Sequence, residues 1–563
     1  MISAAGRILR TVRYLKPGQI GWLVYRRLRP VTPVRVRADN VPVRRQGVGL
    51  APRPCNCWLG WDGSWTFEFV GQARSFTPAS MDWHPADVSR LWRYNLHYFD
   101  YLLDDDCLVA ARDQLLDHWI GANPPGTADG WEAYPTALRI VNWIDYFLRT
   151  DGARAPKDVW LKSLFHQAAW LARNVEYHIR ANHLFKNGVA LLFAGVFFQG
   201  SVAERWLALG RRILETEIAE QFLPDGGHYE RSPMYHSIVT QDVLDVVNLL
   251  RSSPAAPQDL RARFEAKASA AMDFLGDMLH PDGEIALFND SAFGIALPPA
   301  ELRAYAERVL GRKVARQREP EDTVIINRPD TGYYGCRAGV DYLIVDCGAI
   351  GPDYQPGHAH CDMLSFELSI DGERVIVDGG VSGYEGDPLR GFVRSTAAHN
   401  TVCVDGAEQS EMWGTFRVGR RARPLFARIE QMSDDEVVFE GAHDGYAHSA
   451  QRVVHHRRIV YRPGDRVWQI VDRLEGEGEA TIEAFLHFAP GCEVTLHDGV
   501  FTAQSFGGIV KVEIMPRGWD HVAVEGGYSC PQFSHVCSNR VITLRQRLAL
   551  PFEEVMTIEA SAG

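Results

Sequence analysis

Residues 357–380 read GHAHCDMLSFELSIDGERVIVDGG, and residues 394–406 read RSTAAHNTVCVDG. Alternate residues from His358 to Ile370 share one parity, so an extended chain would place imidazoles and an apolar row on a single face. Asp371-Gly372 is a two-residue hairpin signal, after which the chain would return as a buried strand. These stretches predict antiparallel β structure in the second half of the chain.

Three polar residues, His360, Asp378 and His399, fall at the ends of the expected strands. Two imidazoles and a carboxylate could bind zinc. They could equally be hydrogen-bonded polar groups, because H-x-H is a short and common pattern. A plain hairpin closed at Asp371 would set Asp378 opposite Ser365, roughly 16 Å along the strand from His360. A single metal site therefore requires a turn or bulge between His360 and Ser365.

The composition is that of an ordinary globular protein. The chain has 563 residues, 46% of them hydrophobic and 23% charged, with a formal net charge of -12. This length suffices for two or more cores. The acidic balance argues against nucleic acid as a partner, although a local basic and aromatic cleft could still bind an anionic sugar. The ten cysteines are scattered without a C-x-x-C pair, so we expect reduced thiols.

Basic residues interrupt the apolar residues of the N-terminal segment MISAAGRILRTVRYLKP. It lacks the uninterrupted apolar region of a secretory signal, and no stretch of the sequence approaches the ~20 apolar residues of a membrane span. We expect an amphipathic helix with Ile8, Leu9, Val12 and Leu15 on one side, and favour packing on its own domain over anchoring at a membrane. We therefore expect a cytoplasmic protein, with export to the periplasm or medium by another route as the alternative.

The first half of the chain has helical periodicity. From about residue 85 to residue 312, apolar residues recur at spacings of three and four, with short polar, Gly or Pro connections. Serial helical hairpins predict an (α/α) toroid over residues 81–315, with residues 1–80 as an extension packed on it. The expected helices are 88–103, 136–148, 159–179, 184–198, 203–221, 237–250, 260–279 and 300–310.

After a charged linker candidate at 313–322 the periodicity becomes two. Short strands separated by Gly, Asp and Pro predict an antiparallel β-sandwich over residues 325–563, with the domain boundary near 315–325. The expected strands are 342–345, 364–370, 401–404, 436–440, 453–461, 467–471, 481–487, 509–514 and 541–550. The whole chain is thus expected to have an α+β multidomain fold.

Polar clusters in the helical half exceed what helix packing requires. In YHIRANHLFKN (177–187), Asn182 and His183 open an apolar helix, and Asn182 could be its N-cap. The segment LPDGGHYERSPMYH (223–236) is dense in ionisable groups, which favours function. Two earlier segments, RYNLHYFDY and GWEAYPTALRIVNW, mix aromatic and hydrogen-bonding side chains in a way that suits sugar rings. Their candidates, equally open to roles as inter-helix hydrogen-bonding residues, are Asn95, His97, Arg139 and Asn142.

The motifs NHLFKN, DGGHYERSPMYH, GHAHCDMLSFEL and RSTAAHNTVxVDG occur in the order found in the heparinase II/III family of polysaccharide lyases, which the chain resembles over roughly residues 80–550. The resemblance implies an active site in the cleft between toroid and sandwich. By position, Asn182 and His183 would neutralise the substrate carboxylate or assist proton transfer. Tyr235 would be the main catalytic acid/base, and His358 would assist from the β-domain.

The same resemblance implies a structural zinc bound by His360, Asp378 and His399, and no organic cofactor. Because the tyrosine pKa is about 10, Tyr235 would need a cationic neighbour, such as Arg231 or His358, to act as a phenolate. Arg231 is also a candidate substrate-binding residue.

The implied reaction is β-elimination. Removing the C5 hydrogen of a uronate creates an enediolate-like dianion that aimed donors must stabilise, and the product is an unsaturated uronate. We expect a glycosaminoglycan substrate such as hyaluronan, chondroitin or heparan sulfate, with alginate or a bacterial exopolysaccharide as alternatives. Two further hypotheses are a glycoside hydrolase, for which Glu230 and Asp290 look isolated, and a non-catalytic polysaccharide-binding or assembly factor. The sequence does not indicate the oligomeric state.

Overall fold

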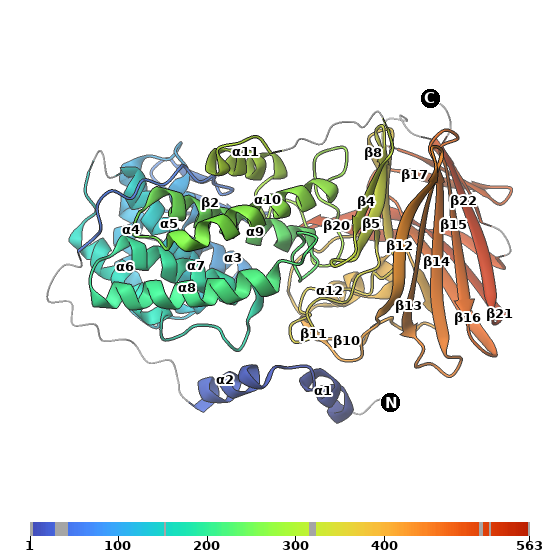
Figure 1. Ribbon diagram of the computed structural model, residues 1–563, viewed down its shortest axis with the longest axis horizontal. Coiled ribbons are helices and arrows are strands. Elements are labelled where there is room, and N and C mark those ends of the chain that lie inside the picture. Colours follow the sequence, from blue (N-terminus) through green and yellow to red (C-terminus); the bar gives the residue numbers. More distant parts are fainter. Residues whose placement is uncertain are drawn as a thin grey trace.

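The computed structural model describes residues 4–28, 43–150, 154–314, 322–505, 511–516 and 519–560. A helical first half is followed by antiparallel sheets, which confirms the predicted α+β multidomain organisation (Figure 1). The closed toroid and the two-layered sandwich stay predictions. Within the described ranges, no helix combines the length and apolarity needed to cross a membrane.

The helices of the first half pack around a core rich in tryptophan, tyrosine and phenylalanine. Each predicted helical segment has a counterpart, but two differ. The segment 88–103 is interrupted at Phe99, which has a left-handed φ of 64°, and the segment 159–179 ends at Leu171. Residues 109–122 form an unpredicted helix, which begins at Leu108 without a side-chain cap. The helices are α3 (Arg90–Tyr98), α4 (Val109–Ala122), α5 (Ala133–Thr150), α6 (Asp158–Leu171), α7 (Ala181–Phe197), α8 (Ser201–Gln221), α9 (Pro233–Ser252), α10 (Arg261–Asp277) and α11 (Pro299–Leu310).

The second half contains a small two-stranded sheet, β10 (Met412–Trp413) and β11 (Arg417–Val418). Its three larger sheets have five, eight and four strands, in the orders β4-β5-β6-β7-β8, β12-β13-β14-β15-β22-β19-β18-β17 and β20-β21-β16-β9. Buried side chains from all three sheets form one hydrophobic core. The strands are β4 (Val324–Arg328), β5 (Tyr333–Ala338), β6 (Asp341–Asp346), β7 (Phe366–Ile370), β8 (Glu373–Ile376), β9 (Val402–Val404), β12 (Pro424–Ser433), β13 (Glu436–Tyr446), β14 (Val453–Arg462), β15 (Val467–Glu475), β16 (Glu479–His487), β17 (Glu493–His497), β18 (Val500–Gln504), β19 (Lys511–Pro516), β20 (His521–Gln532), β21 (His535–Ala549) and β22 (Phe552–Ala560).

The predicted hairpin at Asp371-Gly372 is present. Ile370 pairs with Glu373, and positive φ angles of 53° and 82° at the two turn residues fit a type I′ turn. The predicted strand 364–370 starts two residues later than expected, because β7 begins at Phe366.

The turn that a single metal site required between His360 and Ser365 is present. Ser365 N donates to Asp362 O at 2.9 Å, which closes a turn, and Leu364 within it has a φ of 64°. A bulge separates Leu368 from Ser369. Turn and bulge together replace the plain hairpin register that had kept His360 far from Asp378.

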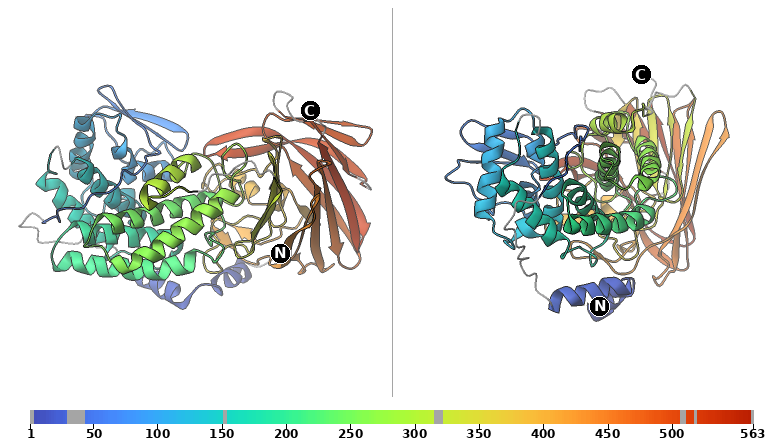
Figure 2. Two further views of the ribbon diagram at one scale, coloured as in Figure 1. Left: turned by 45° about the horizontal axis from the view of Figure 1, so that its top comes forward. Right: turned by 60° about the vertical axis from the view of Figure 1, so that its left-hand side comes forward.

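The domain connection lies largely outside the described residues: α11 ends at Leu310, β4 begins at Val324, and residues 315–321 are not described. The N-terminal extension differs from the prediction, since it packs on both halves. It forms α1 (Ala4–Val12) and α2 (Pro17–Leu28), followed by a small sheet of β1 (Leu59–Trp61), β2 (Trp65–Phe69) and β3 (Gln72–Phe76). Figures 1 and 2 show α1 beside the β-domain and α2 beside the helical domain.

Candidate active site

A cavity of about 730 Å³ lies between the helical half and loops that connect strands of the β-domain. The helical half contributes side chains from the first turns of α7 and α9, and the β-domain contributes loop residues such as Phe416. All four predicted catalytic residues line this one cavity: Asn182, His183, Tyr235 and His358. The fold thus brings together residues that are up to about 175 positions apart in the sequence.

The entry to α7 is strained. Arg180 and Ala181 have φ angles of 66° and 52°, which non-glycine residues rarely adopt and which gather at functional sites. Arg180 occupies the N-cap position, so the N-cap role considered for Asn182 is wrong. Asn182 Nδ2 instead donates to both carboxylate oxygens of Glu230, at 3.2 and 3.0 Å. This entry aims the Asn182 side chain across to the segment that follows α8.

His183 is paired with a buried carboxylate. Its Nδ1 lies 3.2 Å from Glu176 Oε1, and Asn187 Nδ2 donates to the other Glu176 oxygen at 3.1 Å. The imidazole ring packs on Tyr134, with centroids 4.3 Å apart. Burial opposes the charged imidazole, but Glu176 raises the pKa of His183 above its ordinary value. His183 is therefore predisposed to carry a positive charge into the cavity.

Tyr235 lies in the first turn of α9, where Ser232 Oγ caps the helix by accepting from Tyr235 N at 3.1 Å. Its hydroxyl oxygen is 2.9 Å from that of Tyr384, and its ring stacks on the His358 imidazole with centroids 3.7 Å apart. Burial, followed by the Tyr384 hydroxyl, raises the pKa of Tyr235 well above its ordinary value. The Tyr235 side chain is thus held as a neutral phenol.

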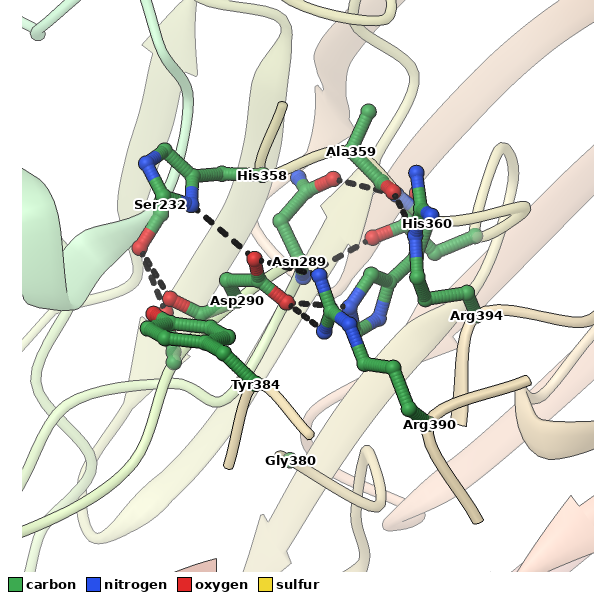
Figure 3. A network of polar contacts seen from close by, with 12 residues as sticks. Ser232, Asn289, Asp290, His358, Ala359, His360, Gly380, Tyr384, Arg390 and Arg394 are labelled. Carbon is green, nitrogen blue, oxygen red and sulfur yellow. Dashed lines mark hydrogen bonds and ion pairs between the residues drawn. The ribbon is translucent and has the colours of Figure 1, made fainter. Parts of the chain in front are cut away.

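His358 is oriented by Asp290 (Figure 3). Its Nδ1 lies 2.9 Å from Asp290 Oδ2, while the same carboxylate accepts from Arg390 Nη2 at 2.9 Å and lies 2.8 Å from His360 Nε2. Burial opposes ionisation, yet Arg390 holds the pKa of Asp290 well below its usual range. An ionised Asp290 accepts a hydrogen bond from Nδ1–H, so Nε2 of His358 is the nitrogen left to accept a proton.

Two of the predicted sugar-contact residues, Asn95 and Asn142, line the cavity. The structure corrects the other three, because His97, Arg139 and Arg231 lie outside its lining. His97 is fully buried and accepts from Trp119 Nε1 at Nδ1, 3.1 Å away. The Arg139 guanidinium lies 4.1 Å from the centre of the same indole and donates to Gln167, so both residues stabilise helix packing.

Arg231 also faces away from the cavity. Its Nε donates to the carbonyl of Thr331 at 2.7 Å, and its Nη2 donates to that of Asp330 at 3.1 Å. It therefore cannot supply the positive charge that the sequence analysis assigned to it beside Tyr235. Its role in the structure is to join the end of the 223–236 segment to the β4–β5 turn.

The sequence analysis missed several cavity residues. Tyr384 lies in the Gly-rich connection after β8, where a single aromatic residue gave no signal, and Glu176 was placed inside a predicted helix that ends earlier. Glu230 and Asp290, considered as a hydrolase pair, are not isolated: Asn182 binds the first and Arg390 the second. Neither carboxylate lines the cavity, which argues against the hydrolase hypothesis.

The candidate zinc ligands lie close together. His399 Nδ1 is 2.6 Å from Asp378 Oδ2, and the rings of His360 and His399 have centroids 5.4 Å apart. Two buried nitrogens, His360 Nδ1 and His399 Nε2, have no hydrogen-bond partner among the described residues. In those same ranges, no group of three His, Cys, Asp or Glu side chains is spaced as a metal site. The donor types suit zinc, with two imidazole nitrogens unused.

Comparisons with known proteins agree with this geometry. Among curated proteins, the chain is similar to heparin-sulfate lyases from Bacteroides thetaiotaomicron (24% identical, covering 75% of this chain and 66% of the relative) and Pedobacter heparinus (26% identical, covering 44% and 39%). It therefore spans just under two thirds of the first relative and less of the second.

Among solved structures, a crystal structure of heparinase III aligns with a TM-score of 0.65 at 18% identity, over 96% of this chain and 89% of that one. The heparan sulfate lyase of Pedobacter heparinus aligns with a TM-score of 0.59 at 19% identity, over 88% and 81%. These likenesses establish a shared fold. Residues 116–306 match the family description "Heparinase II/III N-terminus", and residues 323–546 match "Heparinase II/III-like, C-terminal". The chain belongs to the heparinase II/III family.

Proposed function

We propose that the protein is a polysaccharide lyase that cleaves a uronic-acid-containing glycan by β-elimination at C5. The observation that carries this proposal is the convergence of Asn182, His183, Tyr235 and His358 on one cavity, from both halves of the chain. The relatives named as heparin-sulfate lyases support the same reaction class and an anionic glycosaminoglycan as substrate. A binding factor would not need a raised histidine pKa beside a phenol and a histidine–aspartate pair.

The geometry supports distinct roles for the four residues. Asn182 and a protonated His183 would bind the uronate carboxylate and stabilise the negative charge that develops when C5 loses its proton. His358 Nε2, oriented by Asp290, would accept that proton. Tyr235, kept as a phenol, would protonate the departing O4. The C4–O4 bond breaks as the C4–C5 double bond forms, and proton transfer from His358 to Tyr235 would restore the site.

The charge of the cavity lining points to a substrate with few sulfates. Among the described residues, three Lys or Arg side chains line the cavity, and each pairs with a carboxylate: Arg53 with Asp245, Arg90 with Glu132, and Lys186 with Asp242. Seven Asp or Glu side chains line the same space: Glu68, Asp100, Glu132, Glu176, Asp242, Asp245 and Glu385. Sulfate recognition favours unpaired cations. We therefore expect unsulfated or sparsely sulfated chains to be better substrates than heparin.

A structural zinc is part of the proposal. His360 and His399 would use their unpartnered nitrogens and Asp378 its carboxylate, and the metal would fix the loop that carries His358. Elemental analysis of purified protein by mass spectrometry should then give about one zinc per chain. His399→Ala should abolish zinc retention, while His497→Ala, at an exposed histidine of β17, should leave it intact. Zinc-free parent protein would contradict this assignment.

The reaction is tested by ultraviolet absorbance of the conjugated uronate product. Purified protein would be incubated with heparosan, hyaluronan, chondroitin, heparan sulfate, heparin, alginate and polyglucuronate. Product from the sparsely sulfated chains should form fastest, and Tyr235→Phe should reduce kcat by about 10²-fold or more, whereas exposed Tyr528→Phe should not. New reducing ends without absorbance would instead indicate a hydrolase. No product from any substrate by folded, metal-replete protein would favour the binding-factor hypothesis.

A further inference from the structure

The two N-terminal helices leave an unusual surface uncovered. In Figures 1 and 2, α1 and α2 lie end to end along the outside of the molecule. Large apolar side chains of both helices are exposed, from 38% at Trp22 to 79% at Leu28. We define the outer stripe as the exposed apolar residues Ile8, Leu9, Val12, Ile20, Leu23, Val24 and Leu28.

The opposite sides of both helices are already in use. In α1, Arg10 Nε donates to Glu411 Oε2 at 2.8 Å, and Thr11 Oγ1 accepts from Trp413 Nε1 at 3.0 Å. In α2, Trp22 stacks on Tyr177 with centroids 5.0 Å apart, and Gln19 is buried. These contacts fix the helices to the body, so the outer stripe faces away from it.

The charge of the two helices indicates what kind of partner surface the outer stripe would contact. Residues 4–28 contain six Lys or Arg and no Asp or Glu, in a chain whose net charge is -12. Arg7, Arg10 and Lys16 bind acidic residues of the body, whereas Arg13 and Arg27 are exposed beside the stripe. An apolar stripe flanked by arginines, with Tyr25 at its side, has the composition of a helix that lies in an anionic lipid interface.

The length of α2 decides whether the helix could span a bilayer or would lie flat on its surface. The 12 residues of α2 extend about 18 Å, well short of the hydrocarbon core of a bilayer. We propose that α1 and α2 form an interfacial docking surface for anionic lipid headgroups, with the outer stripe inserted at the headgroup boundary. None of its residues lines the cavity, so docking would place the enzyme at a membrane without changing its chemistry.

Flotation of the full chain with vesicles tests this proposal. Phosphatidylcholine vesicles containing phosphatidylglycerol should bind the protein, and pure phosphatidylcholine vesicles should bind it about tenfold less. Leu23→Ser/Val24→Ser and Arg13→Glu/Arg27→Glu should each weaken binding about tenfold or more. The matched control Leu425→Ser/Met432→Ser, at exposed apolar residues of β12, should bind like the parent. Thermal unfolding of each variant would verify folding.

Several results would overturn the proposal. One is a parent protein that binds neither vesicle, and another is equal binding by the parent and the Leu23→Ser/Val24→Ser variant. Equal affinity for neutral and anionic vesicles would remove the headgroup assignment. A dimer that is seen in sedimentation, does not bind vesicles and dissociates in the stripe variant would show that a second copy covers this surface.

Discussion

Glu176 sets the charge of His183 and should therefore set the alkaline limit of activity. Because the carboxylate raises the His183 pKa, the charged imidazole persists to higher pH than in an ordinary histidine. In Glu176→Gln the pKa should fall, so the descending limb of the kcat/KM profile should move to lower pH, with about a tenfold loss or more at neutral pH. The pH–rate profile measures this shift. Glu68→Gln, at another acidic residue of the cavity lining, should leave the limb in place; movement of the limb in both variants would point to general electrostatics instead.

Asp290 should contribute stability as well as orientation. Its carboxylate faces Arg390, which is only 3% exposed, so Asp290→Asn would leave a buried cation uncompensated and should lower the free energy of unfolding by about 3–5 kcal/mol. Asp282→Asn, at a more exposed carboxylate that binds Arg374, should cost about 1 kcal/mol or less. Urea titrations would compare them.

The pH dependence of the Asp290 effect has a definite sign. The pKa of this group is depressed in the folded state, so its stabilisation is complete above the ordinary carboxyl pKa of about 4. It is lost as the pH falls from there through the folded-state pKa. The difference in unfolding free energy between the parent and Asp290→Asn should therefore shrink below about pH 4. A constant difference would mean that the variant acts through packing.

At the scale of elements, the β7–β8 hairpin depends on its turn. Gly372 has a φ of 82° with open space around it, so Gly372→Ala should cost about 1 kcal/mol through backbone strain alone. Gly276 in α10 also has open space but lacks a positive φ, and Gly276→Ala should instead stabilise by about 0.5–1 kcal/mol. Thermal unfolding of the two variants should give shifts of opposite sign, and equal shifts would contradict the strain argument.

The sequence predicted elements well where the signal was local. Asp371-Gly372 specified the hairpin because few residues tolerate two positive φ angles. The start of the strand predicted at Leu364 was less exact, because Leu364 adopts a left-handed conformation that its residue type does not announce. The aromatic and polar mixture around His97 and Arg139 was ambiguous for a similar reason: tryptophan faces stack on a buried guanidinium as readily as on a sugar.

Site residues were predictable when a motif carried them and not when a distant partner defined them. Asp290 looked isolated because Arg390 lies 100 positions later in the chain. Tyr384 had no local pattern, and only the fold places its hydroxyl against Tyr235. The acidic cavity lining was likewise invisible in the sequence, since it draws residues from position 68 to position 385.

At the scale of the molecule, the active site exists only while the two halves are held in register, since Tyr235 and His358 come from different halves. Arg231 connects the two halves, because its guanidinium donates to the carbonyls of Asp330 and Thr331 across that boundary. Figure 2 shows the β-sheets set against one end of the helical half. Loss of these hydrogen bonds should therefore reduce both the stability of the protein and its catalytic activity.

Arg231→Ala leaves the carbonyl groups of Tyr229, Asp330 and Thr331 without their charged donor, so we expect a loss of about 3 kcal/mol in unfolding free energy. We also expect calorimetry to resolve two transitions where the parent shows one, because the halves would no longer unfold together. The kcat should fall more than KM rises, since the four catalytic groups would be misaligned while much of the cavity lining persists. Arg428→Ala removes an exposed arginine that binds Glu440 on the β12–β13 surface, and it should change stability by about 1 kcal/mol or less without altering kcat. If the two variants behaved alike, Arg231 would be an ordinary surface arginine and the register of the halves would depend on other contacts.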